Sequence, residues 1–277
     1  MKYKKMVHIV RKRFRKIREV FPRVAARFEG ADIHAFRVEI KKLRAFLRLL
    51  AGTKGRAGRL KLPTQLHRLY QLAGQIRNLQ LQQQHIREVF KEDEEKLPHA
   101  YLKKLRMEEE NYVLLTARLV RDKLSIKKEE KKLIMALPGH LRTRSREDLI
   151  RAQSARLEKL AGSITPIPDE TMHSIRKLIK DLLYTRPYIQ REAALMLPGS
   201  LLSEKGDRSI TKALGELQDA RTGLQLLQAS YVDPIADGEE KAVLEDLKRR
   251  WTEKKEKKKE KINALVINSI HPRPSMP

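Results

Sequence analysis

Two versions of one pattern occur in the sequence: His34-Ala-Phe-Arg37-Val-Glu-Ile-Lys41-Lys42-Leu43-Arg44 and His173-Ser-Ile-Arg176-Lys177-Leu-Ile-Lys180-Asp181-Leu182-Leu183-Tyr184. Each version places an arginine three residues after the histidine and a lysine seven residues after it. Because these intervals follow the helical period, the three side chains share one face of a helix. The pattern therefore predicts two related helices that each carry a basic face.

The basic face is longer in the first version. At about 100° per residue, it occupies roughly a quarter of the helix circumference. Its members are His34, Arg37, Lys41, Arg44 and Arg48. A separate apolar stripe runs beside it and is formed by Phe36, Ile40, Leu43, Leu47 and Leu50. Like charges at i,i+3 and i,i+4 repel one another, so this row favours a polyanionic partner lying along the helix.

A second repeated landmark indicates an internal duplication. Ala73-Gly74-Gln-Ile76-Arg77-Asn78-Leu79 follows the first pattern, and Leu214-Gly215-Glu-Leu217-Gln218-Asp219-Ala220 follows the second. The spacing between the two copies is nearly the same for the histidines and for the glycines. We therefore expect two related halves, residues 1–143 and 144–277. A glycine inside a helix costs about 1 kcal/mol relative to alanine, and close approach of another helix backbone is the expected compensation.

The rest of the chain reads as helices separated by proline and glycine. We expect helices at about 3–28, 31–51, 64–92, 98–124, 145–163, 168–197, 207–231 and 239–267, and a short additional helix at 126–137. Pro22 and Pro187 lie inside these ranges and are expected to kink or end their helices. The predicted fold is all-α, with two antiparallel four-helix bundles related by a pseudo-twofold axis and packed as one unit.

Charge and composition indicate the kind of partner. The chain has 277 residues, a formal net charge of +26 and no cysteine. Such a charge attracts nucleic acid, an anionic membrane or another phosphate polymer. The start of the chain lacks the apolar run of a signal peptide, and no stretch approaches the ~20 apolar residues of a membrane span. A cytoplasmic protein without a membrane span is therefore expected.

At these residues the sequence resembles the CHAD domain, the conserved histidine α-helical domain. The histidine patterns carry the resemblance, together with the two glycine segments, which are similar to the family's Leu-Gly-x-x-Arg-Asp motif. The resemblance implies two four-helix bundles with a basic channel between them that binds inorganic polyphosphate, and it makes association with polyphosphate granules possible. The residues assigned to polyphosphate are His34, Arg37, Lys41, Lys42, Arg44, Arg48, Arg77, His173, Arg176, Lys177 and Lys180.

The second copy departs from the pattern at several positions. Leu183 stands where the first copy has Arg44, and Asp181 stands where it has Lys42. In the glycine segments, Asn78 replaces the usual aspartate and Gln218 replaces the usual arginine. The second half is therefore expected to contribute fewer cations to a shared site than the first.

Three other interpretations of the basic faces remain open. They could be solvated surfaces, which most charge runs are, or they could bind nucleic acid, although aromatic residues make up only 5% of the chain. Glu170-x-x-His173 has the spacing of di-iron bundles, but Ala31 occupies the matching first-half position. A metal-dependent phosphate enzyme is disfavoured because few acids lie near the basic segments, so no catalytic residues, metal or cofactor are expected.

Three further segments carry weaker signals. Gly52-x-x-Gly55-x-x-Gly58 lacks the order of a P-loop and is interpreted as a surface connection. The lysine-rich run at 254–261 is expected to be an exposed helix face. His8, Lys12 and Arg15 either line the edge of a channel or face water. The oligomeric state cannot be predicted.

Overall fold

The computed structural model describes residues 1–51, 60–141, 143–162, 167–189, 204–228 and 238–270. Its α-helices are α1 (Tyr3–Arg27), α2 (Gly30–Ala51), α3 (Thr64–Val89), α4 (His99–Lys123), α5 (Ile126–Met135), α6 (Thr143–Gly162), α7 (Asp169–Thr185), α9 (Glu204–Leu226) and α11 (Gly238–Ile270). Two short 3-10 helices, η2 (Glu94–Lys96) and η3 (Arg186–Tyr188), complete the described elements. The predicted all-α class is confirmed, and α5 corresponds to the short additional helix.

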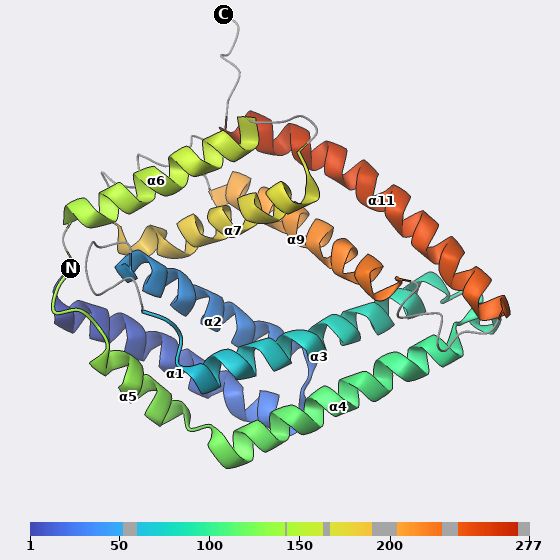
Figure 1. The fold of residues 1–277 in the computed structure, drawn as a ribbon, viewed down its shortest axis with the longest axis horizontal. Helices are drawn as coiled ribbons and strands as arrows, with labels where there is room; N and C mark the ends of the chain where they lie inside the picture. Colours follow the sequence, from blue (N-terminus) through green and yellow to red (C-terminus); the bar gives the residue numbers. More distant parts are fainter. Residues whose placement is uncertain (52–59, 142, 163–166, 190–203, 229–237, 271–277) are drawn as a thin grey trace, which may run out of the picture.

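The helices of each part of the chain pack mainly on one another. In the first part, α2 packs between α1 and α3, while α3 also contacts α4, and α5 contacts both α1 and α3. In the second part, α6, α7, α9 and α11 form a closed ring of contacts. The two parts meet where α2 contacts α7 and α6, and where α3 contacts α9 (Figure 1). Because α2 carries the first basic pattern and α7 carries the second, the α2–α7 contact brings the two patterns together.

Three clusters of buried apolar side chains hold this arrangement. The first lies among α1 to α5, and the second among α6, α7, α9 and α11. The third joins α3 and α4 to Leu227, which follows α9, and to α11. Core packing therefore ties the two parts together as well as filling each of them.

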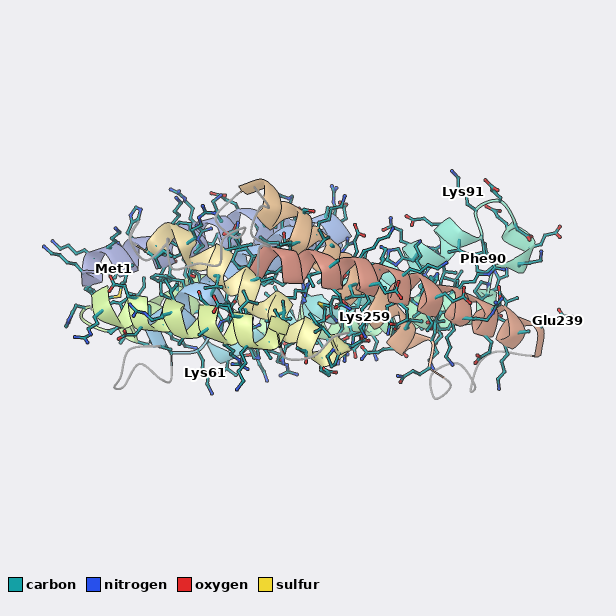
Figure 2. All side chains as sticks on the ribbon, turned by 90° about the horizontal axis from the view of Figure 1, so that it is seen from above. Met1, Lys61, Phe90, Lys91, Glu239 and Lys259 are labelled. Carbon is teal, nitrogen blue, oxygen red and sulfur yellow. The ribbon has the colours of Figure 1, made fainter. Side chains whose placement is uncertain are left out.

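The start of α11 lies near the end of α3 at one end of the molecule. Figure 2 shows Glu239 of α11 beside Phe90 and Lys91, which follow α3, while Met1 lies toward the opposite end. Here the carboxylate of Glu240 accepts hydrogen bonds from the backbone N–H groups of Ala100 and Tyr101, at 3.1 and 2.7 Å. Because the first N–H groups of a helix lack intrahelical partners, Glu240 caps α4 from another helix.

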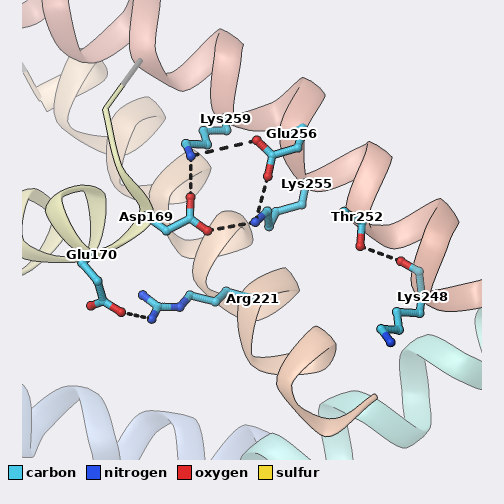
Figure 3. A network of polar contacts seen from close by, with 8 residues as sticks. All are labelled: Asp169, Glu170, Arg221, Lys248, Thr252, Lys255, Glu256 and Lys259. Carbon is cyan, nitrogen blue, oxygen red and sulfur yellow. Dashed lines mark hydrogen bonds and ion pairs between the residues drawn. The ribbon is translucent and has the colours of Figure 1, made fainter. Parts of the chain in front are cut away.

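The N-terminus of α7 is held by α11. Asp169 forms ion pairs with Lys255 at 2.8 Å and with Lys259 at 2.7 Å, and Glu256 also contacts Lys255 (Figure 3). The side chains of Lys255 and Lys259 are only 14% and 16% exposed. The expectation that the whole 254–261 run is a solvated face was therefore wrong for these two lysines, because helical spacing turns them toward α7.

The two prolines inside predicted helices behave differently. Pro22 lies within α1, and the helix continues past it to Arg27. The capping residue Phe28 has left-handed backbone geometry, with φ of 52°. Burial of the Phe28 ring and a 2.8 Å hydrogen bond from Gln80 Nε2 to its carbonyl oppose the cost of that conformation. Pro187 lies in η3, so α7 ends at Thr185, well before the predicted residue 197.

Parts of some predictions lie outside the described residues. These are the glycine-rich segment from Gly52 to Gly58, the end of the predicted 168–197 helix beyond residue 189, and residues 229–231 of the predicted 207–231 helix.

Replacing Glu240 with alanine should destabilise the protein by about 1 kcal/mol, the usual cost of losing a helix cap. Urea unfolding monitored by circular dichroism measures this change. Glu239→Ala is the matched control, because Glu239 is the exposed neighbour in the same turn of α11. Equal losses from both substitutions would contradict the capping role.

Candidate functional site

Cationic side chains from three helices converge where α2 packs against α7. We call this group the cationic cluster. It consists of His34, Arg37, Lys41 and Arg44 of α2, Arg77 of α3, and Arg176 and Lys180 of α7. Among the described carboxylates, that of Asp219 on α9 acts to raise the pKa of Lys41, Arg176 and Lys180. The two basic faces predicted from the sequence therefore do meet.

Burial and mutual repulsion disfavour the charged forms of the two lysines. The pKa of Lys41 is lowered to about 7, first by burial and then by the charges of Arg37, Lys180 and Arg176. The pKa of Lys180 is lowered to about 8, again by burial and by Arg176. Asp219 opposes both shifts. Among the described residues, no carboxylate forms an ion pair with either lysine, so Asp219 offsets their charges only from a greater distance.

His34 and Arg176 are also in an unfavourable environment for a cation. Burial lowers the pKa of His34, and the nearby charges of Lys41, Arg77 and Lys180 lower it further. Burial also lowers the pKa of Arg176, although Asp219 opposes this shift. The Nε atom of Arg176 is buried and has no hydrogen-bond partner among the described residues. An unsatisfied buried donor costs about 1–3 kcal/mol, and a hydrogen bond from Arg176 Nε to an anionic oxygen would offset this cost.

Arg37 is fixed by an aromatic ring and a glycine. Its Nη1 donates a 2.7 Å hydrogen bond to the backbone carbonyl of Tyr70, and its guanidinium lies 4.5 Å from the centre of the Tyr70 ring. Arg44 lies 5.2 Å from the same ring centre. A Cβ atom added at Gly74 would overlap the Arg37 guanidinium, with the Cζ atom at 2.9 Å. Gly74 therefore makes room for an arginine.

A reciprocal contact fixes Arg77. A Cβ atom at Gly30 of α2 would overlap the Arg77 guanidinium and lie 3.0 Å from Gln80 Oε1. Thus α2 and α3 each provide a glycine for an arginine of the other helix. The expected approach of a helix backbone to the glycines was wrong, because these neighbours are side chains. At Gly215, a Cβ atom would meet no described atom within 4 Å.

Two predicted site residues of α2 are engaged elsewhere. Lys42 forms a 2.7 Å ion pair with Glu39, whose carboxylate also pairs with Arg13 of α1 at 2.8 Å. Arg48 forms an ion pair with Asp181 of α7. Asp181, which replaces a lysine of the first copy, therefore links the two parts of the chain. Helical spacing placed Arg48 on the basic face but could not reveal this partner.

Of the site residues predicted in the second copy, some lie in the cationic cluster and others do not. Arg176 and Lys180 belong to the cationic cluster, whereas Lys177 is exposed. The Nδ1 atom of His173 lies 2.5 Å from Gln218 Oε1, in a hydrogen bond whose direction depends on the tautomer. Gln218 stands where the family usually has arginine, so this departure supplies the partner of His173. The two histidines are therefore not in equivalent surroundings.

Tyr70 was not predicted as part of the site, and Asp219 appeared in the sequence only as a member of the second glycine segment. Neither belongs to the repeated histidine pattern, and only the packing of α3 and α9 brings them close. A cleft of about 380 Å³ lies between α3, α9 and α11, and Asp219 is part of its lining. Its charged lining mixes acids and lysines, with Lys258 paired to Glu216 at 2.8 Å, which makes it a weaker candidate for a polyanion.

Two other kinds of site were sought in the described part of the chain. No group of three or more histidine, aspartate or glutamate side chains there could hold a metal ion. Glu170 instead pairs with Arg221 (Figure 3). No described helix combines the length and apolar character needed to cross a membrane.

Comparison with known proteins places the chain in a family. It is similar in structure to the crystal structure of the CHAD domain from the plant Ricinus communis, with a TM-score of 0.60 and 14% identity over 98% of this chain and 88% of that chain. The model of the CHAD domain family matches residues 8–228, and the chain therefore belongs to this family. No curated protein gives a significant match. The match ends before α11, which begins at Gly238.

A double-mutant cycle should detect the contact between Gly74 and Arg37. Alone, Gly74→Ala should give little or no stabilisation, because displacement of the guanidinium from Tyr70 offsets the gain in helix propensity. In an Arg37→Ala background it should stabilise by about 1 kcal/mol. Chemical unfolding of the four proteins gives the coupling.

Gly215→Ala is the matched control, because it occupies the corresponding position without a described neighbour. This substitution should stabilise the wild-type protein by about 1 kcal/mol. If Gly74→Ala stabilised the wild-type protein equally, Gly74 would not be needed to accommodate Arg37.

The ligand-free protein should become more stable as pH rises above 7. Folded Lys41 and Lys180 release protons near pH 7 and 8, whereas the unfolded lysines keep theirs up to about pH 10.5. The unfolded state therefore binds more protons in this range, and the penalty present below pH 7 is progressively relieved. We expect a gain of about 1 kcal/mol between pH 7 and 9.5, allowing for partial exposure.

Urea unfolding across this pH range measures the gain. A Lys41→Met/Lys180→Met variant should show a flatter profile and greater stability at pH 7. An unchanged profile in this variant would show that other groups cause the dependence.

Proposed function

We propose that this protein binds inorganic polyphosphate without catalysis, in a basic channel between the helical bundles of its two halves. The supporting observation is the convergence of Lys41, Arg176 and Lys180 across the α2–α7 contact without a described carboxylate in an ion pair with either lysine. Membership of the CHAD family, which is associated with polyphosphate binding, agrees with this proposal.

The chemistry of the cluster suits a phosphate chain. Polyphosphate carries about one negative charge per unit and has no bases, so it needs only cations and donors. Arginines offer forked donors, and lysines act as mobile charges. Bound phosphates would favour the charged forms of Lys41 and Lys180 and could accept a hydrogen bond from the unpaired Arg176 Nε. Ligand binding would therefore relieve the repulsion that the free protein contains.

The alternative is nucleic-acid binding at the same cluster. Single-stranded nucleic acid is usually bound by stacking bases on aromatic rings. Tyr70 is the aromatic ring next to Arg37, and it already lies against Arg37 and Arg44. A ligand without bases fits this surface better.

The proposal also includes an internal duplication, with α2 and α7 as corresponding helices. The order of histidine, arginine and lysine in both helices supports it, as does their contact. The surroundings differ, since His34 lies among cations and His173 pairs with Gln218. We therefore propose that the first half supplies more of the binding site. A cytoplasmic location with recruitment to polyphosphate granules completes the proposal.

Neutralising the cluster should weaken polyphosphate binding at least tenfold. The test variant is Lys41→Gln/Lys180→Gln, and the matched control is Lys257→Gln/Lys261→Gln, which removes two exposed charges from α11. The control should lose less than about threefold. Isothermal titration with polyphosphate of defined lengths, in buffers of different ionisation enthalpy, measures both affinity and proton uptake.

Wild-type protein should take up protons on binding at pH 8, because bound phosphates raise the lysine pKa values, and affinity should increase with chain length and fall steeply with salt. The control should keep the proton uptake and the test variant should lose most of it. Equal affinity losses in both variants would indicate diffuse attraction. Equal or tighter RNA binding at matched salt that is lost in Lys41→Gln/Lys180→Gln would favour the alternative, and phosphate release with Mg²⁺ would contradict a non-catalytic role.

A further inference from the structure

The outward face of α1 forms a second basic surface. Its exposed cations are Lys4, Lys5, Arg11, Lys12, Arg15, Lys16, Arg23 and Arg27, together with His8. Glu19 is the exposed acid of this helix, and it lies 3.9 Å from Arg15. Near the end of the helix, Arg23 pairs with Asp32 at 2.8 Å and Arg27 pairs with Glu29 at 3.6 Å, so the unpaired charge is concentrated between Lys4 and Lys16. The opposite side of α1 carries buried apolar residues of the core, including Phe14 and Ile17. The charged half of the helix therefore faces away from the protein.

This surface is separate from the cationic cluster. Arg13 of α1 contacts Glu39 of α2 at 2.8 Å, and Glu39 lies about 200° around α2 from Lys41 at 100° per residue. In Figure 1, α2 lies between α1 and α7. His8, Lys12 and Arg15, which could have lined a channel edge, therefore lie on the outside of the molecule. A ligand in the cluster cannot neutralise them.

The surface is also particular to α1. The outer helix of the second part, α6, lies along the other edge of the molecule in Figure 1. Its exposed cations Arg144, Arg151, Arg156 and Lys159 are accompanied by the exposed acids Asp148 and Glu158. The exposed charges described on α6 are therefore fewer and better balanced than those on α1. The charge on α1 is a local feature that the exposed position of an outer helix does not require.

The cations of α1 form two rows along the helix. One row contains Lys4, His8, Arg11 and Arg15, and the other contains Lys5, Lys12, Lys16 and Arg23. At about 100° per residue the rows are roughly 90° apart, and at 1.5 Å per residue they extend over about 28 Å. A helix with its side chains is about 10–12 Å across, close to the ~12 Å width of the major groove of DNA.

We propose that the outward face of α1 binds the phosphate backbone of double-stranded nucleic acid. The two rows would contact the phosphates on either side of a groove, which a duplex presents already ordered. A flexible polyphosphate chain would reach one side of this convex surface only and would lose entropy on binding. Besides the cations, the exposed residues on this side of α1 are Glu19, Pro22 and Ala26. None of them is aromatic or has a large apolar side chain, which disfavours insertion into a membrane interface or stacking on single strands. This interaction goes beyond polyphosphate binding and does not depend on it.

Removing three charges from α1 should selectively weaken duplex binding. The test variant is Arg11→Gln/Lys12→Gln/Arg15→Gln, and the matched control is Arg151→Gln/Arg156→Gln/Lys159→Gln on α6. Both lose the same charge from exposed positions. Fluorescence anisotropy with a labelled 20-base-pair DNA duplex, at several salt concentrations, measures affinity. The α1 variant should bind at least tenfold more weakly, and its salt slope should fall by about 2–3. The control should change less than threefold.

Polyphosphate titrations of the same variants distinguish the two sites. The α1 variant should keep its polyphosphate affinity within about threefold, while Lys41→Gln/Lys180→Gln should keep its duplex affinity. Circular dichroism and thermal unfolding confirm that each variant folds. Equal duplex losses in the α1 and α6 variants, or no duplex binding by wild-type protein at 100 mM salt, would overturn the proposal. The proposal would also fail if the α1 variant lost as much affinity for polyphosphate as for the duplex. It would fail as well if the wild-type protein bound anionic vesicles but not the duplex.

Discussion

The burial of Lys41, Arg176 and Lys180 close to one another is the constraint around which α2 and α7 are packed. The lowered pKa values of both lysines show that the folded protein opposes their charged forms. Apolar packing beside the cluster must offset this cost. Fully burying one leucine or isoleucine contributes about 1.5–3 kcal/mol, and α7 alone buries Ile175, Ile179 and Leu182. These three side chains anchor α7 in the core of the second part, and the Arg48–Asp181 ion pair then links α7 to α2.

Uncharged contacts give the arginines fixed positions within this repulsive environment. Tyr70 supplies a carbonyl acceptor and a ring to Arg37, and glycines on α2 and α3 leave space for Arg77 and Arg37. A carboxylate would hold an arginine more strongly, but it would also neutralise the charge that a polyanion needs. Arg48 illustrates this difference, because its pair with Asp181 joins the two helices and leaves less free charge. Cations of one predicted face thus divide between structural and ligand-accessible roles.

Helical periodicity predicted the parts of the structure that depend on local spacing. It gave the all-α class, most helix boundaries within a few residues, and the shared face of His34, Arg37 and Lys41. It could not identify partners distant in sequence, such as Arg13 for Glu39, Asp169 for Lys255, or Gln218 for His173. The role of Gly74 was missed for the same reason, since a glycine shows where space is needed without showing what occupies it. Tyr70 carries no local signal for its contact with Arg37.

The chain's positive charge has two different structural settings. In the cationic cluster, burial between helices makes each charge costly, and a polyanion bound there would favour the protonated forms of Lys41 and Lys180. On α1 the cations are exposed, where solvent screens them and repulsion costs little. Buried cations can therefore couple ligand binding to stability and pH, whereas exposed ones act mainly through long-range attraction. The net charge of +26 does not distinguish buried from exposed cations, because this distinction depends on how the helices pack.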